Sequence, residues 1–103
     1  MSREVSSHLL TASIIAYVGF GSRRTPGADE AAVLALDPVD GARTLDVVKR
    51  IVRTSDSLHI SEEAFGNQNK SILFGEEFEK LWPGLTPEAL NALSWRWSYN
   101  EFF

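Results

Sequence analysis

Two closely spaced glycines and two arginines make residues 19–27, GFGSRRTPG, the segment of this chain that comes closest to a ligand-binding motif. Backbone N–H groups of a glycine-rich loop can hold a phosphate, and neighbouring guanidinium groups bind phosphate or carboxylate in a bidentate way. The pattern departs from both common phosphate-binding motifs. Arg24 stands where a dinucleotide-binding loop has its third glycine, and no Gly-Lys-Ser/Thr sequence follows. Helices often end at a glycine in the left-handed conformation, so we favour the interpretation that Gly19 or Gly21 ends a helix.

Arg23 and Arg24 are candidate anion-binding residues with two interpretations. Next to a helix N-terminus they would suit an external carboxylate or phosphate. Alternatively they are solvated, or they pair with Asp29 and Glu30, which lie close by in the sequence. Arginines in loops are usually of this second kind, so we favour it and keep the first open.

The chain carries few other residues suited to catalysis or metal binding. His8 and His59 are its two histidines, and neither belongs to a His-x-x-x-His or Glu-x-x-His pair. The sequence has no cysteine, which excludes disulfides and thiolate chemistry, and no serine in a nucleophile-elbow pattern. We therefore expect no catalytic residue, no metal and no cofactor.

Aromatic residues gather near the carboxyl end of the sequence. On a helix, Trp95 and Tyr99 lie off the apolar stripe that the neighbouring leucines form, so they need cover from the rest of the domain, a second copy or another protein. Trp95, Tyr99, Phe102 and Phe103 are therefore candidate residues of a partner interface. Packing in the chain's own core is the favoured alternative, because a small chain has few other large side chains to fill its interior.

Helices are expected to position these residues, since apolar side chains recur at helical spacing. Residues 2–18 are apolar on two sides, which is typical of a central helix in a bundle, although residues 13–20 also suit a buried strand. A second helix is expected over residues 26–36. It would have a proline at its first position and Asp29 and Glu30 in its first turn.

The clearest helix covers residues 37–53, DPVDGARTLDVVKRIVR. Asp37 is expected to cap it, and the following proline to take the first helical position. Asp46 and Arg50 are spaced for a weak ion pair on its charged side. The opposite side is apolar and should face the core; it consists of Leu45, Val48, Ile51 and Val52.

The remaining sequence predicts two more helices. Residues 54–69 are expected to form a loop, with or without a helical turn after Ser61. A helix over residues 70–82 should end at a Pro-Gly pair. The last helix should be capped by Thr86, open with a proline and run at least to Ser98.

The chain length and the expected helices agree with one all-α domain over residues 1–103, a compact bundle of five or six short helices. The formal net charge of −4 argues against nucleic acid as a partner, because binding to phosphates requires clustered basic side chains. No apolar segment suits a membrane span and no signal peptide is recognisable, so we expect a cytoplasmic protein with no membrane partner.

We expect a protein-binding or regulatory module, for example a bacterial-type inhibitor or immunity protein that masks a basic partner, or one that binds a second copy of itself. Small size, acidity and the aromatic cluster suggest this class. Two alternatives stay open. One is an anion- or metabolite-binding domain that uses Arg23 and Arg24. The weaker one is a DNA-binding helical domain that uses residues 43–53, where four side chains are basic and one is acidic.

Overall fold

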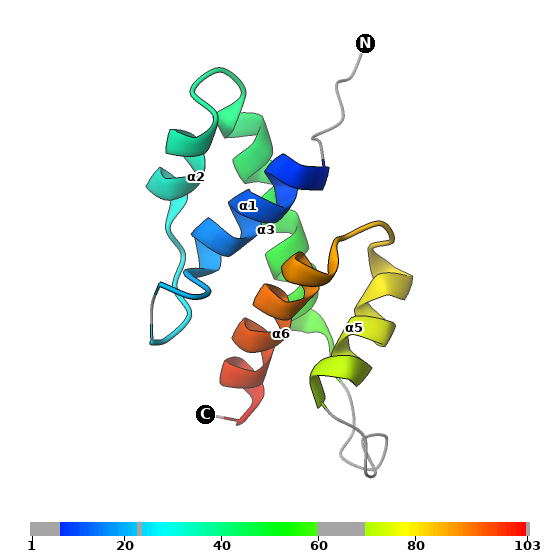
Figure 1. The fold of residues 1–103 in the computed structure, drawn as a ribbon. Coiled ribbons are helices and arrows are strands. Elements are labelled where there is room, and N and C mark those ends of the chain that lie inside the picture. The colour runs from blue at the N-terminus through cyan, green and yellow to red at the C-terminus, as the bar shows by residue number, and fades with distance from the viewer. Residues whose placement is uncertain (1–6, 23, 60–69, 103) are drawn as a thin grey trace.

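The computed structural model describes residues 7–22, 24–59 and 70–102, and within these ranges it contains helices and no strand (Figure 1). The expectation of an all-α chain is thereby confirmed. Residues 13–18, which the sequence also allowed as a strand, are helical. The helices are α1 (Ser7–Val18), α2 (Glu30–Leu36), α3 (Gly41–Ser57), α5 (Lys70–Leu81) and α6 (Pro87–Phe102).

Helices α1, α3 and α6 form the centre of the bundle and contact one another. Helix α2 packs on α1 and α3 at one edge of the molecule, and α5 packs on α6 at the opposite edge (Figure 1). The central place of α1 agrees with its sequence, which is apolar on more than one side. The two peripheral helices each have one side toward the bundle and one side toward solvent.

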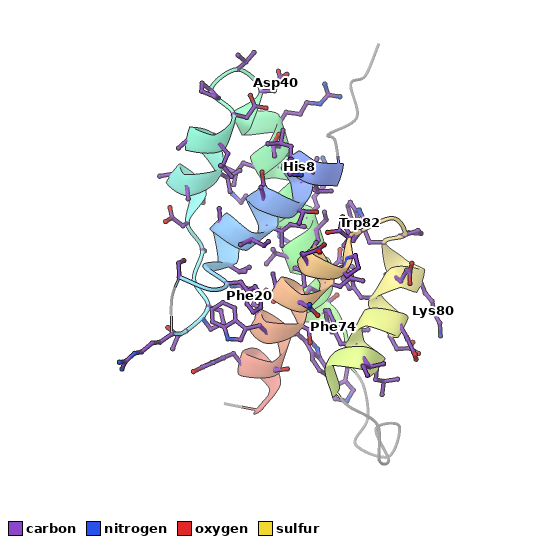
Figure 2. All side chains as sticks on the ribbon, in the orientation of Figure 1. His8, Phe20, Asp40, Phe74, Lys80 and Trp82 are labelled. Atoms are coloured by element: carbon purple, nitrogen blue, oxygen red, sulfur yellow. The ribbon has the colours of Figure 1, made fainter. Side chains whose placement is uncertain are left out.

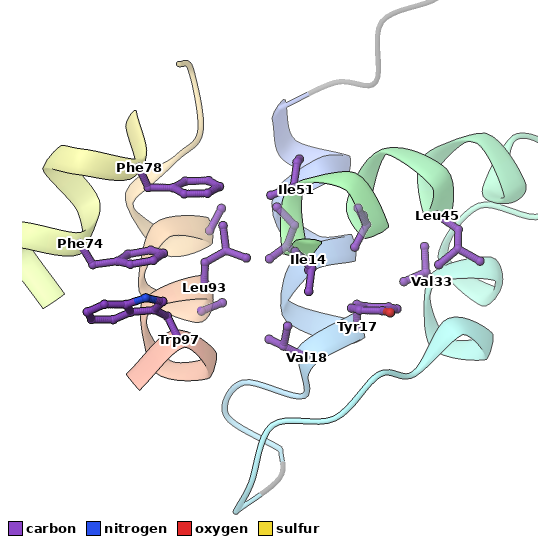
Figure 3. Close-up of a cluster of buried hydrophobic side chains, with 14 of the residues drawn as sticks. Ile14, Tyr17, Val18, Val33, Leu45, Ile51, Phe74, Phe78, Leu93 and Trp97 are labelled. Atoms are coloured by element: carbon purple, nitrogen blue, oxygen red, sulfur yellow. The ribbon is translucent and has the colours of Figure 1, made fainter. Parts of the chain in front are cut away.

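One continuous core joins all the helices (Figure 3). At the α5 edge, the rings of Phe74 and Phe78 stack with centroids 5.4 Å apart, and Phe74 lies 5.2 Å from the indole ring of Trp97. The indole Nε1 of Trp97 donates a hydrogen bond of 2.8 Å to the carbonyl of Leu58, just after α3. This bond satisfies the only polar atom of a buried tryptophan side chain and ties the end of α3 to α6.

Helix α3 buries the apolar face that its sequence predicts. Leu45, Val48, Ile51 and Val52 are all buried. On the exposed side, Arg50 Nη2 lies 3.1 Å from Asp46 Oδ2, so the expected ion pair is present. The helix extends to Ser57, four residues beyond the end of the predicted segment, so the prediction that the loop starts at residue 54 is wrong.

The start of α3 differs from the prediction, because the helix begins at Gly41 and not at Pro38. Asp37 Oδ1 accepts hydrogen bonds from the N–H groups of Val39 (3.2 Å) and Asp40 (3.0 Å). An aspartate can stabilise either a helix start or a tight turn through such bonds, and here it stabilises a turn that precedes the helix.

Helix α2 also begins later than predicted. Asp29 is the N-cap residue and its Oδ1 accepts a 3.0 Å hydrogen bond from the N–H of Ala32, so the helix starts at Glu30 and not at Pro26. Glu30 lies in the first turn, as expected.

The boundaries of the last two helices agree with the sequence analysis. Helix α5 ends at Leu81, before a turn in which Gly84 has a φ of 93°. The Thr86 hydroxyl accepts a 3.2 Å bond from the N–H of Ala89, and Pro87 is the first residue of α6. Helix α6 continues to Phe102, past the predicted minimum. The helical turn considered after residue 61 lies outside the described residues.

None of the helices described by the structure combines the length and the apolar character that a membrane crossing requires.

Candidate functional site

The glycine-rich segment after α1 ends that helix, as the sequence analysis favours. Gly19 and Gly21 both have a φ of 83°, the left-handed region that glycine adopts without a Cβ clash. The N–H groups of Gly19 and Phe20 both donate to the carbonyl of Ile15, at 2.9 and 3.2 Å. These bonds satisfy the end of the helix in the manner of a glycine C-cap.

Further N–H groups of the same segment are bonded to carbonyl oxygens of the protein. A phosphate-binding loop directs such donors toward its ligand, whereas these donors fold the segment back along the end of α1. The bonds run from Ser22 to Gly19 (3.1 Å), from Gly27 to Val18 (2.9 Å) and from Asp29 to Tyr17 (2.9 Å). Of the two candidate anion-binding residues, Arg24 is exposed and Arg23 lies outside the described residues, so anion binding there stays a prediction.

The aromatic residues near the carboxyl end fall into two groups. Trp97 is buried, while Trp95 and Tyr99 are half-buried, with ring centroids 6.2 Å apart in an edge-to-face arrangement. Phe20, from the turn after α1, places its ring 5.5 Å from that of Trp95 (Figure 2). Sequence reasoning missed Phe20, because nothing in the local pattern links that turn to α6.

Part of the cover that Trp95 needs therefore comes from the chain itself. The side chain of Phe102 and the whole of Phe103 lie outside the described residues. That a partner interface includes Trp95, Tyr99, Phe102 and Phe103 stays a prediction.

Arg96 joins three parts of the chain through its guanidinium group. Its Nε and Nη2 atoms each lie 3.1 Å from an oxygen of Asp56 near the end of α3, in a bidentate pair. Its Nη1 atom donates a 3.1 Å bond to the carbonyl of Gly27 in the segment that leads to α2. The side chain is 19% exposed and that of Asp56 is 35% exposed, so the pair is only partly hydrated. Arg96 thus has a structural role, which the sequence did not reveal.

Helix α2 is almost entirely apolar in sequence, but most of its residues are exposed or half-buried. Six of its seven residues, EAAVLAL, are apolar, but only Val33 is buried. A helix that is apolar on all sides is normally buried in a core. Leu34 and Leu36 are 42% and 45% exposed, and Val39, in the following turn, is 88% exposed. We call the exposed apolar residues of this region the α2 surface: Ala31, Leu34, Ala35, Leu36 and Val39.

The α2 surface is bordered by carboxylates. Residues 29–40 contain four acidic side chains and no basic one. Glu30 has a partner on α3: Lys49 Nζ lies 3.7 Å from its Oε2 atom, and the two side chains are 52% and 38% exposed, Glu30 and Lys49 respectively. Asp40 occupies the N-cap position of α3, but its exposed side chain makes no capping hydrogen bond (Figure 2). Exposed apolar residues and carboxylates therefore follow one another closely along this segment.

A surface depression of about 400 Å³ lies between α1 and the start of α6. The hydroxyls of Thr11 and Thr86 in its wall are hydrogen-bonded to each other at 2.6 Å, and Thr86 also caps α6. His8 and Glu88 stand exposed at its border. In the part of the chain that the structure describes, no three metal-ligating side chains come together there or elsewhere.

Comparisons with known proteins add no residue role to this geometry: no family model matches the sequence, and no curated protein and no solved structure matches it. The α2 surface is the candidate functional site, because it exposes large apolar side chains on a fixed helix. Leu34, Leu36 and Val39 are half of the six large apolar residues found exposed in the described ranges.

Proposed function

We propose that this protein is a protein-binding module that acts by association, with the α2 surface as its contact area. The observation that carries the proposal is that α2 is apolar on all sides but has only Val33 in the core. The exposed apolar residues lie within residues 31–39, and apolar side chains exposed close together among polar ones are typical of protein-interaction sites.

Contact with a partner would remove apolar area from water. Burying a large aliphatic side chain completely is worth about 1.5–3 kcal/mol relative to full exposure. Leu34 and Leu36 retain nearly half of their exposure and Val39 retains most of it, so a substantial part of this free energy is still available for binding. Few residues usually supply most of the binding free energy in an interface, and these three are the natural candidates on this surface.

The α2 surface is also held rigidly, which lowers the entropic cost of binding. Val33 anchors the helix in the core, and Asp29 caps its first turn. At the other end, Gly41 is buried so close to α2 that an added Cβ atom would lie 3.1 Å from the Cα atom of Leu34. The apolar side chains are thus presented on a backbone that is fixed at both ends.

Site-specific photo-crosslinking tests the proposal. A photoreactive phenylalanine analogue replaces Val39 in cells that express the protein from its own gene, and mass spectrometry identifies the crosslinked products. The matched control carries the analogue in place of Ile72, which is exposed on α5 at the opposite edge of the bundle. We expect a defined crosslinked protein from position 39 and none from position 72.

A second pair of variants removes the apolar contact itself. Leu36→Ser combined with Val39→Ser should reduce crosslinking from a probe placed at Leu34, while Ile72→Ser combined with Leu81→Ser, matched in exposed apolar character, should not. The proposal is wrong if position 39 gives no crosslinked protein, or if the α5 substitutions reduce the product as much as the α2 substitutions do.

A further inference from the structure

The segment that carries the α2 surface is strongly acidic. The chain has fourteen acidic and ten basic residues, and four of the acidic residues and none of the basic ones lie in residues 29–40. The rest of the sequence therefore holds ten of each and is formally neutral. Lys49 on α3, which lies 3.7 Å from Glu30, offsets part of this charge, but the segment around α2 remains acidic.

The carboxylates at this border are exposed enough to meet a partner. Glu30 and Asp40 are exposed, and Asp40 does not bond to the N–H groups of the helix that it precedes. Asp37 uses its Oδ1 atom for the turn between α2 and α3, and its side chain is half-buried. All three flank the apolar residues of the α2 surface in the sequence.

We propose, on the basis of the function proposed above, that the α2 surface binds a basic amphipathic segment of another protein. Apolar residues of that segment would contact Leu34, Leu36 and Val39, and its lysines or arginines would lie near the carboxylates of Glu30, Asp37 and Asp40. The charge pattern favours such a partner because complementary borders accelerate encounter and select against wrong partners.

The same charge argues against the other occupants of an apolar surface. A symmetric contact with a second copy would bring two acidic segments together, and juxtaposed like charges oppose association. An anionic lipid surface would repel the segment in the same way. Helix α2 is about 10 Å long, since seven residues rise about 1.5 Å each. The apolar centre of the contact is therefore small, and charge should contribute a large part of the binding free energy.

A random-peptide display selection against the folded protein tests this inference directly. We expect the enriched peptides to combine apolar residues with an excess of lysine and arginine. Their binding should shift the backbone amide NMR signals of residues 30–41, and Leu36→Ser with Val39→Ser should abolish it. Raising the salt concentration from about 0.05 M to about 0.5 M should weaken it severalfold, because exposed charges are then screened.

Isosteric neutralisation separates charge from shape. The triple variant Glu30→Gln, Asp37→Asn and Asp40→Asn keeps the side-chain oxygen that the turn needs and should weaken peptide binding about tenfold, as expected for three exposed ion pairs. The control variant Glu76→Gln, Glu77→Gln and Glu79→Gln removes the same charge from α5 and should leave the affinity within about twofold.

The outcomes distinguish this inference from the proposed function. Enriched peptides that bind the α2 surface without a basic excess, or equally well to the neutralised variant, overturn the basic partner but leave a protein-binding module. A dimer in sedimentation that the α2 substitutions dissociate would make a second copy the occupant and would also overturn it. Absence of any peptide that binds at the α2 surface overturns both proposals.

Discussion

Replacement of Arg96 by alanine should destabilise this protein far more than the removal of an ordinary surface arginine. The variant Arg96→Ala loses a bidentate ion pair with Asp56 and a hydrogen bond to the carbonyl of Gly27. A hydrogen bond from a charged group contributes about 1.5–3 kcal/mol, and a fully exposed ion pair about 0.2–1 kcal/mol. The pair here is largely shielded, but Asp56 is hydrated enough to escape the full penalty of a buried unpaired charge.

We therefore expect Arg96→Ala to lower the free energy of unfolding by about 2–3 kcal/mol. For a chain of this length that corresponds to a fall in Tm of about 10 °C. Arg50→Ala is the matched control, because Arg50 also pairs with an aspartate at 3.1 Å, but with side chains that are 66% and 61% exposed. It should cost only about 0.3–0.5 kcal/mol.

Urea denaturation followed by tryptophan fluorescence measures the free energy of unfolding of both variants, and the slope m should be the same as in the unsubstituted protein. Arg96→Lys keeps the charge but not the planar fork, so it should recover less than half of the loss. If Arg96→Ala shifts the urea midpoint no more than Arg50→Ala, the guanidinium does not hold these three segments together and the reasoning fails.

Three further predictions concern two buried side chains and two glycines. Trp97→Phe removes the donor to the Leu58 carbonyl and should cost about 1–3 kcal/mol in urea denaturation; an unchanged midpoint would contradict the importance of that bond. Gly75→Ala should stabilise the protein by about 0.5–1 kcal/mol, because Gly75 is helical with open space at its Cβ position. Gly21→Ala should destabilise the protein, because Gly21 has a φ of 83°. Calorimetry should show Tm shifts of opposite sign for the two variants. Ser94→Ala should be neutral or stabilising by up to about 1 kcal/mol, since the buried hydroxyl has no hydrogen-bond partner among the described residues; a clear loss of stability would refute this.

The sequence predicted the features that depend on local chemistry. The apolar face of α3 follows from residue spacing alone, and the glycine at the end of α1 follows from the conformation that a helix end requires. Thr86 followed by Pro87 marks the start of α6 for the same reason. These predictions hold because neighbouring residues decide them.

The predicted starts of α2 and α3 were wrong because one side chain has two local uses. Asp29 was expected in the first turn of α2 but caps that helix, whereas Asp37 was expected to cap α3 but stabilises a turn; the sequence does not distinguish these uses. The choice is made by contacts that are remote in sequence. The close approach of Gly41 to Leu34 lets α3 begin against α2.

The sequence analysis did not predict the α2 surface as the candidate site, because its exposure depends on contacts between distant parts of the chain. An apolar run such as EAAVLAL is typical of a core helix, so exposure of Leu34 and Leu36 follows only from the placement of α2 at the edge of the bundle. The contacts of Phe20 with Trp95, and of Arg96 with Asp56, likewise depend on the path of the whole chain.

The way in which α2 is attached has a consequence for the partner binding proposed above. Backbone bonds from Gly27 and Asp29 to carbonyls of α1, together with Val33 in the core, fix the helix without help from its outward residues. Ala31 and Ala35 can therefore be exchanged for larger or charged side chains at little cost in stability. The same backbone could then serve as an adjustable scaffold, on which a few substitutions redirect recognition from one target to another.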